Sequence, residues 1–153
     1  MVEAGEKAPG FTLPADDGQT VNLEDLRGKR VVLYFYPKDD TSGCTTEACE
    51  FRDSWKAVSR AGAVVLGVSP DSVNSHVKFK QKYKLPFPLL ADTDHRVAEA
   101  YGAWGERSMY GRKYQGILRS TFIIDEAGKV ARVFPKVKPK GHAAEVLEAL
   151  QAL

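Results

Sequence analysis

The sequence feature that most constrains the fold is an uninterrupted run of six residues, mainly β-branched and aromatic, from Val31 to Tyr36, which Pro37 ends. Such a run predicts a strand buried on both faces, as strands are at the centre of a sheet covered by helices. Residues 63–68, Ala-Val-Val-Leu-Gly-Val, form a second run of this kind. Two buried strands separated by a stretch of helical spacing predict a parallel pair joined by a right-handed crossover.

The remaining elements follow from periodicity and turn signals. We expect helices over residues 44–60, 71–84, 94–101 and 142–153, and short extended pieces near Phe11, Leu13 and Val21. A short strand at residues 89–90 and a β-hairpin over residues 121–134 complete the pattern. The hairpin adds antiparallel strands, so the order predicts an α/β fold with a central mixed β-sheet and helices on both faces. No linker or repeat divides residues 1–153, and we expect a single domain that is similar to the thioredoxin-like fold.

Composition narrows the class of protein further. The chain has 43% hydrophobic and 27% charged residues, and its 22 basic against 20 acidic residues leave a net charge of only +2. This balance gives no electrostatic case for nucleic-acid or membrane partners. No apolar run approaches the roughly 20 residues that span a bilayer, and the N-terminus lacks a signal-peptide pattern. We therefore expect a cytoplasmic protein, in which two cysteines are more plausibly chemical than structural.

Cys44 is the first candidate for chemistry. Residues 39–43, Asp-Asp-Thr-Ser-Gly, supply helix N-cap chemistry directly after the first buried strand, which places Cys44 in the first turn of a helix. Unpaired amide N–H groups and the helix dipole there favour the thiolate, the reactive form of the side chain. A small buried hydrophobe is the competing interpretation of a free cysteine. Position alone leaves both interpretations open.

Cys49 distinguishes between these interpretations. Residues five apart in a helix have Cα atoms about 8.6 Å apart, whereas a disulfide requires less than about 7 Å. The pair is therefore poorly placed for a static crosslink, and we expect Cys49 on the polar side with Arg52 and Asp53. It suits a reaction cycle in which the first turns unwind after Cys44 has reacted, because Thr45 and Thr46 are weak helix formers.

The residues around Cys44 resemble a known family. Residues 37–44, Pro-Lys-Asp-Asp-Thr-Ser-Gly-Cys, fit the Pro-x-x-x-Thr-x-x-Cys signature of the peroxiredoxins. The spacing from Cys44 to Cys49 is similar to that of the bacterioferritin-comigratory, or peroxiredoxin Q, subfamily. Residues 7–13 and 119–125 resemble the opening and the late strand of that family, so the resemblance covers nearly the whole chain.

The resemblance implies a thiol peroxidase that reduces hydrogen peroxide and organic hydroperoxides, with a role in antioxidant defence. Cys44 would be the peroxidatic nucleophile and become a sulfenic acid. Cys49 would resolve it by forming an intramolecular disulfide, which thioredoxin or a similar dithiol donor then reduces. Both cysteines lie in one chain, so a monomer suffices. Neither a metal nor an organic cofactor is implied.

Four further site residues come from the resemblance, each with a competing structural interpretation. Thr41 would hold the thiolate and the peroxide through its hydroxyl, although a helix cap uses the same chemistry. Arg119 would stabilise the thiolate and the charge on the leaving oxygen, although a lone arginine at a strand edge is usually solvated. Pro37 would shield the sulfur or merely end the strand. Glu47 would orient Arg119 or be an exposed first-turn glutamate.

Two other functions remain to be weighed. A thioredoxin-type disulfide oxidoreductase would carry Cys-x-x-Cys, which is absent here, and a redox sensor would use the same disulfide without efficient turnover. The three histidines are too widely spaced to complete a zinc site with two cysteines, and we expect them on the surface; they are His76, His95 and His142. We also expect residues 104–117 to be a long surface loop and Lys136, Lys138 and Lys140 to be solvated.

Overall fold

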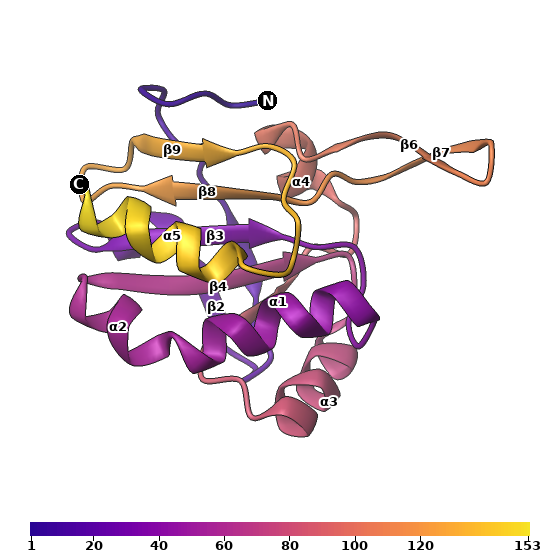
Figure 1. Cartoon of the computed structure of the whole chain (residues 1–153), viewed down its shortest axis with the longest axis horizontal. Coiled ribbons are helices and arrows are strands. Elements are labelled where there is room, and N and C mark those ends of the chain that lie inside the picture. The colour runs from indigo at the N-terminus through magenta and orange to yellow at the C-terminus, as the bar shows by residue number, and fades with distance from the viewer.

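The computed structural model describes all residues 1–153 and centres on a five-stranded mixed sheet (Figure 1). Its strands run in the spatial order β5-β4-β3-β8-β9. The pairs β3–β4 and β4–β5 are parallel, whereas β8 is antiparallel to both β3 and β9. The expected mixed sheet is therefore present, with the apolar run of residues 31–36 at its centre. The strands are β3 (Arg30–Phe35), β4 (Ala63–Ser69), β5 (Leu89–Ala91), β8 (Ser120–Ile124) and β9 (Val130–Phe134).

The helices lie close to their expected positions, with one correction. They are α1 (Ser42–Asp53), α2 (Trp55–Arg60), α3 (Val73–Tyr83), α4 (Arg96–Tyr101) and α5 (His142–Gln151), and a 3₁₀ turn covers Leu23–Leu26. The single helix expected over residues 44–60 is wrong, because it begins at Ser42 and is broken at Ser54. Ser54 leaves helical geometry at ψ 3°, and serine favours such breaks because its side chain competes for backbone hydrogen bonds.

Two small hairpins form two-stranded sheets of their own. The strands β1 (Thr12–Pro14) and β2 (Thr20–Asn22) correspond to the expected short extended pieces, and they pair antiparallel. The strands β6 (Trp104–Met109) and β7 (Arg112–Ile117) also pair antiparallel and extend away from the body of the molecule (Figure 1). The expected surface loop over residues 104–117 is therefore wrong. Tyr110 and Gly111 both have positive φ, 51° and 78°, and such a pair closes a two-residue hairpin turn.

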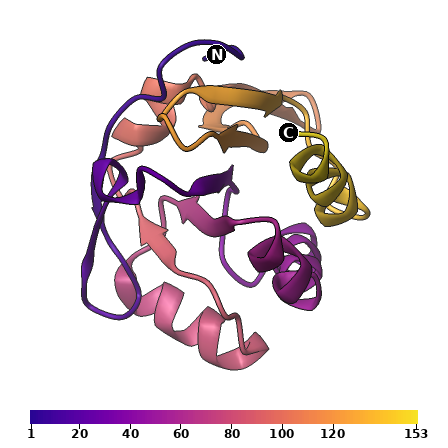
Figure 2. The same cartoon turned by 90° about the vertical axis from the view of Figure 1, so that its left-hand side faces the viewer.

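The sheet separates two buried cores. Alternation along β3 sends Val31, Leu33 and Phe35 into one cluster of 19 buried residues and Val32 and Tyr34 into another of the same size. The first cluster, which we call the scaffold face, packs α4 and the N-terminal segment against the sheet. The second, which we call the helical face, packs α1, α2, α3 and α5 (Figure 2). None of the helices is both long and apolar enough to cross a membrane.

Candidate active site

Cys44 lies in the first turn of α1, on the helical face of the sheet. Thr41 is the N-cap in extended conformation (φ −99°, ψ 157°), and its carbonyl accepts the Thr45 N–H at 2.8 Å. The Cys44 side chain is buried, with 1% of its residue surface exposed. The expected position of the thiol at a helix start is therefore observed, among amide groups that have no partner within the helix.

Arg119 approaches Cys44 from the start of β8, the strand next to β3 in the sheet. It directly precedes β8, and Ser120 pairs with Phe35 at the end of β3, so the antiparallel register brings residue 119 beside the start of α1. Its Nη2 donates to Cys44 Sγ at 3.3 Å, and its Nη1 donates to Glu47 Oε1 at 2.8 Å. Hydrogen bonds from a guanidinium to an anionic acceptor are stronger than neutral ones. Arg119 is thus not the solvated residue of the competing interpretation.

The charge on Arg119 is favoured by its two partners. Burial lowers the pKa of Arg119, but the charges of Glu47 and Cys44 and their hydrogen bonds outweigh this effect, so the net shift is upward. A cation held beside a sulfur stabilises the thiolate relative to the thiol. The site therefore places a fixed positive charge against the one buried cysteine.

Glu47 is buried behind Arg119 and accepts a hydrogen bond from its guanidinium. It lies one helical turn after Cys44, on the same face of α1, and only 1% of its surface is exposed. Burial raises the pKa of Glu47 from 4.5 to about 7, against the opposing effect of Arg119. Its second oxygen, Oε2, has no hydrogen-bond partner. The exposed first-turn glutamate of the competing interpretation is therefore wrong, because the carboxylate points inward to Arg119.

Gly43 permits a close approach that the sequence did not reveal. A Cβ atom at this position would lie 3.2 Å from Pro139 Cγ and 3.3 Å from Arg119 Nη2. The absence of a side chain thus lets the segment before α5 and the guanidinium both reach the first turn of α1. Only the distance of about one hundred residues between Gly43 and Pro139 hid this contact from local sequence patterns.

A surface groove of about 550 Å³ leads to Arg119. Its walls combine apolar and basic side chains, and Arg107 from β6 contributes to it. Lys136 and Lys138, which also line the groove, are exposed as expected, and Lys140 is exposed as well. Arg119, whose side chain is 16% exposed, can therefore be approached by a small molecule from this groove.

Thr41 and Pro37 also lie at this end of β3. The Thr41 hydroxyl donates to the Lys38 carbonyl at 2.8 Å, and it makes no hydrogen bond to Cys44. A hydroxyl that donates in this way keeps its lone pairs free to accept a hydrogen bond. Pro37 is half-buried and lies two residues after Phe35, the last residue of β3. The structure brings both residues to the site without linking either to the sulfur.

Cys49 occupies the same helix as Cys44 and is half-buried. Both cysteines are free thiols, and α1 continues unbroken from Ser42 to Asp53. Ideal helix geometry therefore applies to the pair and keeps their Cα atoms about 8.6 Å apart. The two sulfurs cannot bond while this part of α1 is helical.

The histidines differ from their expected surface positions. His76 and His142 are buried, with 0% and 1% of their surfaces exposed, and His95 is half-buried and stacked on Trp104 at a ring separation of 3.7 Å. His142 bonds to Thr121 at 2.7 Å and to Glu145 at 2.6 Å, and burial lowers its pKa. The prediction failed because burial depends on partners from other elements, such as Thr121 of β8 for His142 and Trp104 of β6 for His95. No cysteine lies in a metal-binding group with any histidine.

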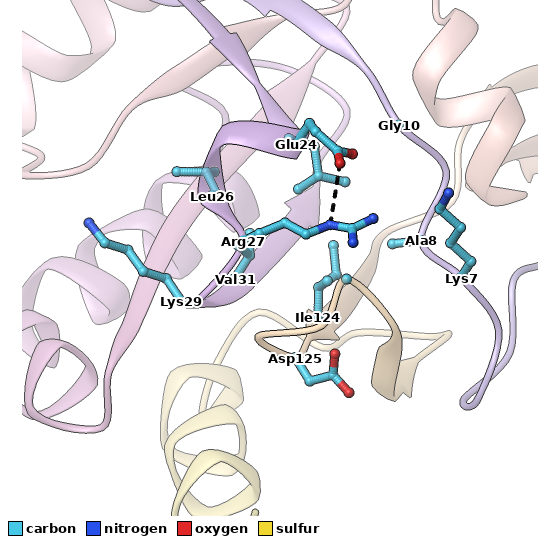
Figure 3. Close-up of a pocket in the computed structure, with 12 residues that line it drawn as sticks. Lys7, Ala8, Gly10, Glu24, Leu26, Arg27, Lys29, Val31, Ile124 and Asp125 are labelled. Atoms are coloured by element: carbon cyan, nitrogen blue, oxygen red, sulfur yellow. Dashed lines mark ion pairs between the residues drawn. The ribbon is translucent and has the colours of Figure 1, made fainter.

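A second hollow, of about 90 Å³, lies at the opposite end of β3 (Figure 3). Arg27 and Glu24 form an ion pair of 3.6 Å across it, with Lys7 and Asp125 nearby. Its lining includes neither a cysteine nor a histidine, and Arg27 and Glu24 are the one ion pair among its charged residues. The chemistry of the chain is therefore concentrated at the Cys44 end of the sheet.

A thiol at a helix start, faced by an arginine at the edge of a mixed sheet, defines a class of thiol peroxidases. Residues 4–133 match the AhpC/TSA family, and the chain belongs to this family. More narrowly, it falls in the bacterioferritin-comigratory, or peroxiredoxin Q, group. Peroxiredoxin Bcp of Bacillus subtilis is 52% identical over 150 residues, covering 98% of this chain and 96% of the relative. Peroxiredoxin Bcp of Escherichia coli is 46% identical over 150 residues, with the same coverage.

Solved structures agree with this assignment. A structure of Xanthomonas campestris peroxiredoxin Q superposes with a TM-score of 0.91 at 40% identity, covering 99% of this chain and 98% of that one. A Xylella fastidiosa peroxiredoxin Q variant gives a TM-score of 0.94 at 36% identity, with 99% and 97% coverage. The expected thioredoxin-like α/β fold and the family resemblance are both confirmed, and the chain is a thiol peroxidase.

Proposed function

We propose that Cys44 reduces hydrogen peroxide and organic hydroperoxides. The observation that carries this proposal is the guanidinium of Arg119, held between the Cys44 sulfur and the buried carboxylate of Glu47. In the reaction the Cys44 thiolate attacks the terminal peroxide oxygen and the O–O bond breaks. The sulfur is oxidised to sulfenic acid, and the leaving oxygen takes up a proton to become water or an alcohol.

Arg119 and Thr41 supply what the transition state requires. Negative charge moves from sulfur to the leaving oxygen, and a fixed cation within reach of both positions stabilises that shift. Glu47 fixes the orientation of Arg119 from the buried side, so the guanidinium needs no rearrangement when the peroxide arrives. The Thr41 hydroxyl is free to accept a hydrogen bond from the peroxide, and Pro37 limits the access of water to the sulfur. The bacterioferritin comigratory protein of Xanthomonas campestris, a structural neighbour of this chain, has alkyl peroxide reduction activity.

Cys49 resolves the sulfenic acid. Its sulfur attacks Cys44 Sγ, the S–O bond breaks, and water leaves as the intramolecular disulfide forms. This step requires the helix between the two residues to open, since the intact helix holds them beyond bonding range. A thioredoxin-like dithiol then reduces the disulfide and restores both thiols. Because one chain contains both cysteines, a monomer completes the cycle.

A coupled assay tests the proposal. We expect the wild-type protein to consume hydrogen peroxide and an alkyl hydroperoxide continuously when thioredoxin, thioredoxin reductase and NADPH are supplied. Cys44→Ser should show no turnover, because no other thiol lies at a helix start. Cys49→Ser serves as the matched control, since it keeps Cys44 and should lose recycling only. Wild-type turnover by Cys44→Ser would contradict the assignment, and oxidation without turnover would favour the redox-sensor interpretation.

Amide hydrogen exchange tests whether α1 opens when the disulfide forms. Formation of the disulfide should reduce amide-exchange protection over residues 44–50, while the strands of the central sheet remain protected. Arg52, whose Nη1 donates to the Tyr83 carbonyl at 2.7 Å, holds the following turn to α3 and should limit how far the opening spreads. Unchanged protection over residues 44–50 after oxidation would contradict the resolving step.

A further inference from the structure

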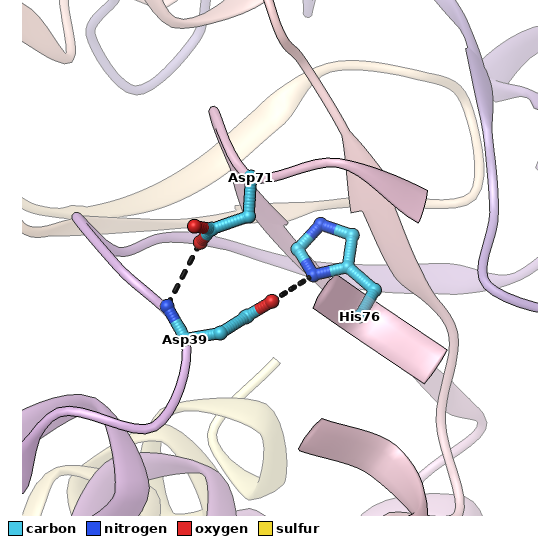
Figure 4. A group of neighbouring side chains, drawn as sticks. All are labelled: Asp39, Asp71 and His76. Carbon is cyan, nitrogen blue, oxygen red and sulfur yellow. Dashed lines mark hydrogen bonds and ion pairs between the residues drawn. The ribbon is translucent and has the colours of Figure 1, made fainter. Parts of the chain in front are cut away.

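The loop that precedes α1 is held by a buried polar network (Figure 4). Asp39 lies in this loop, between β3 and the N-cap of α1, and its side chain is only 4% exposed. Its Oδ1 accepts the Tyr36 hydroxyl at 2.6 Å, and its Oδ2 accepts the Ser75 hydroxyl at 2.8 Å. His76 Nδ1 lies 2.7 Å from the same Oδ2. Three side chains, Tyr36 directly after β3 and Ser75 and His76 on α3, therefore converge on one carboxylate of the loop.

His76 links this carboxylate to the main sheet. Its second ring nitrogen, Nε2, lies 2.9 Å from the Leu90 carbonyl of β5. Each ring nitrogen therefore lies within hydrogen-bond distance of an acceptor, Asp39 Oδ2 on one side and the Leu90 carbonyl on the other. The ring is fully buried on α3 and bridges β5 to the Asp39 loop without any water-exposed atom. Its position is thus fixed by the fold at two points.

The backbone of the loop is held as well. The Asp39 N–H donates to Asp71 Oδ2 at 2.8 Å, and the Ser69 hydroxyl donates to the same oxygen at 2.6 Å. The three ligand-type atoms of Asp39, Asp71 and His76 lie within 4.8 Å of one another, but each already takes part in a hydrogen bond. The group is a closed network of hydrogen bonds, and nothing in it points to a metal ion.

The next residue shows why such anchoring matters. Asp40 has φ 58°, in the left-handed region that non-glycine residues occupy only when their surroundings hold them there. Its carboxylate accepts from Lys82 Nζ at 2.7 Å and from the Tyr83 hydroxyl at 2.8 Å. Thr41, the N-cap of α1, follows directly. The shape of this turn sets where Thr41 and the first amides of α1 stand relative to Cys44.

We propose that His76 is a positioning residue for the peroxide reaction: through Asp39 it fixes the loop that carries Thr41 and begins α1. This inference rests on the proposed function of Cys44. We call the contact between His76 and Asp39 the clamp. It acts on the loop before Cys44, so it holds the first turn of α1 in place while the turns after Cys44 are free to open. Small displacements of a reacting group reduce rates steeply, by about a hundredfold for 1 Å.

A matched pair of substitutions separates the two bonds of the ring. In His76→Asn the amide nitrogen occupies the position of Nδ1 and can still donate to Asp39, while the bond to Leu90 is lost. In His76→Gln the amide nitrogen reaches the position of Nε2 and can still donate to Leu90, while the bond to Asp39 is lost. Each variant replaces the same ring and loses one bond, so a merely structural role predicts equal effects.

Two measurements compare the variants, both made at a temperature well below the midpoint of thermal unfolding of either variant. We expect the second-order rate constant for oxidation of Cys44 by hydrogen peroxide to be at least about tenfold lower in His76→Gln than in His76→Asn. Amide exchange over residues 38–44 should be faster in His76→Gln and close to wild type in His76→Asn. Equal rate constants and equal exchange in the two variants would overturn the proposal.

The design keeps the clamp and the peroxidase activity distinguishable. If the wild-type protein did not react with peroxide, the proposed function would fail, but the exchange of residues 38–44 would still decide whether the Asp39 bond holds the loop. If the wild-type protein reacts and both variants retain its rate constant, the clamp is wrong and the proposed function stands.

Discussion

The two faces of the central sheet bury cores of equal size and opposite character. The scaffold face and the helical face each contain 19 buried residues. On the scaffold face the ionisable member is Tyr101, whose hydroxyl donates to the Pro9 carbonyl at 2.7 Å. The one buried acid that adjoins this face is Asp92, which accepts the Val97 and Ala98 N–H groups at the start of α4. The helical face contains Cys44, and buried Glu47, His76 and His142 adjoin it. One face supplies apolar packing and the other carries the chemistry.

This difference shows that a small domain can bury polar groups at the ends of its strands. Removing charges from water is unfavourable unless they are paired, and the helical face pairs them in local groups at the ends of strands. Asp39 follows β3, Asp71 follows β4, and Arg119 precedes β8 at the same edge. Ligands of open α/β sheets gather at the carboxyl ends of parallel strands for the same topological reason. Predictions that treat the faces separately therefore test the comparison.

The largest expected effect is on stability, from the scaffold face. Phe122 is fully buried and packs against Phe35 and Tyr101, with ring separations of 5.8 and 5.1 Å. Phe122→Ala should lower the free energy of unfolding by about 4 kcal/mol, because it leaves a cavity in a close-packed core. The rate constant of Cys44 with peroxide should stay near wild type wherever the variant is folded. Urea unfolding measures the loss of stability, and single-turnover oxidation measures the rate constant of Cys44. If Phe122→Ala lowered this rate constant as well, the distinction between the two faces would be wrong.

The next effect is on reactivity, from the helical face. Arg119→Met removes the cation from both Cys44 and Glu47, and we expect the rate constant with peroxide to fall by about a hundredfold to a thousandfold. Stopped-flow measurement of Cys44 oxidation is the test. Arg96→Met is the matched control, because the Arg96 side chain is 84% exposed and pairs only with Asp94 at 3.3 Å. An Arg119→Met rate constant within a few-fold of the control would contradict the assigned role.

A third effect concerns pH and Glu47. The pKa of this carboxyl is raised by burial to about 7 from 4.5, so the folded state holds its proton more tightly than the unfolded state. Its contribution to stability is present below pH 4.5 and is lost as the pH rises through about 7, and its magnitude is up to about 3 kcal/mol. Glu47→Gln should remove this loss. Urea unfolding of the wild type and of Glu47→Gln from pH 5 to 8 measures the difference. If the free energy of unfolding had the same dependence on pH in both proteins, the raised pKa of Glu47 would be refuted.

The smallest effect is expected outside both faces. Gly111 closes the β6–β7 hairpin at φ 78°, and Gly111→Ala should destabilise the hairpin by about 1 kcal/mol because a Cβ disfavours that conformation. Faster amide exchange confined to residues 104–117 is the expected result. The rate constant of Cys44 should not change. A loss of peroxide reactivity would show that the hairpin belongs to the site.

Sequence patterns predicted the parts of the molecule that depend on local information. The apolar run of residues 31–36 identified the central strand, and the capping residues 39–43 identified the helix start at Cys44. Arg119 came instead from the resemblance to the peroxiredoxin family. Even the break at Ser54 altered only the length of the expected helix. These features follow from periodicity, capping and a specific motif, all of which are readable within a few residues.

Other parts required the three-dimensional structure because their causes are distant in sequence. His76 is buried because Asp39 and Leu90 meet it, and Pro139 reaches Gly43 only when α5 docks. Glu47 could be read as exposed or buried until Arg119 was seen beside it. A lone polar residue has no periodicity, and its burial depends on a partner that the local sequence does not contain.

The central claim is that Cys44 alone reacts with peroxide and that Cys49 acts afterwards. Cys49→Ser, in which Cys44 is the only thiol, should be treated with one equivalent of hydrogen peroxide in the presence of dimedone and analysed by intact-protein mass spectrometry. We predict rapid conversion to a single dimedone adduct on Cys44, at the wild-type rate of peroxide consumption. A protein that remains unmodified while the wild type consumes the peroxide would contradict the account.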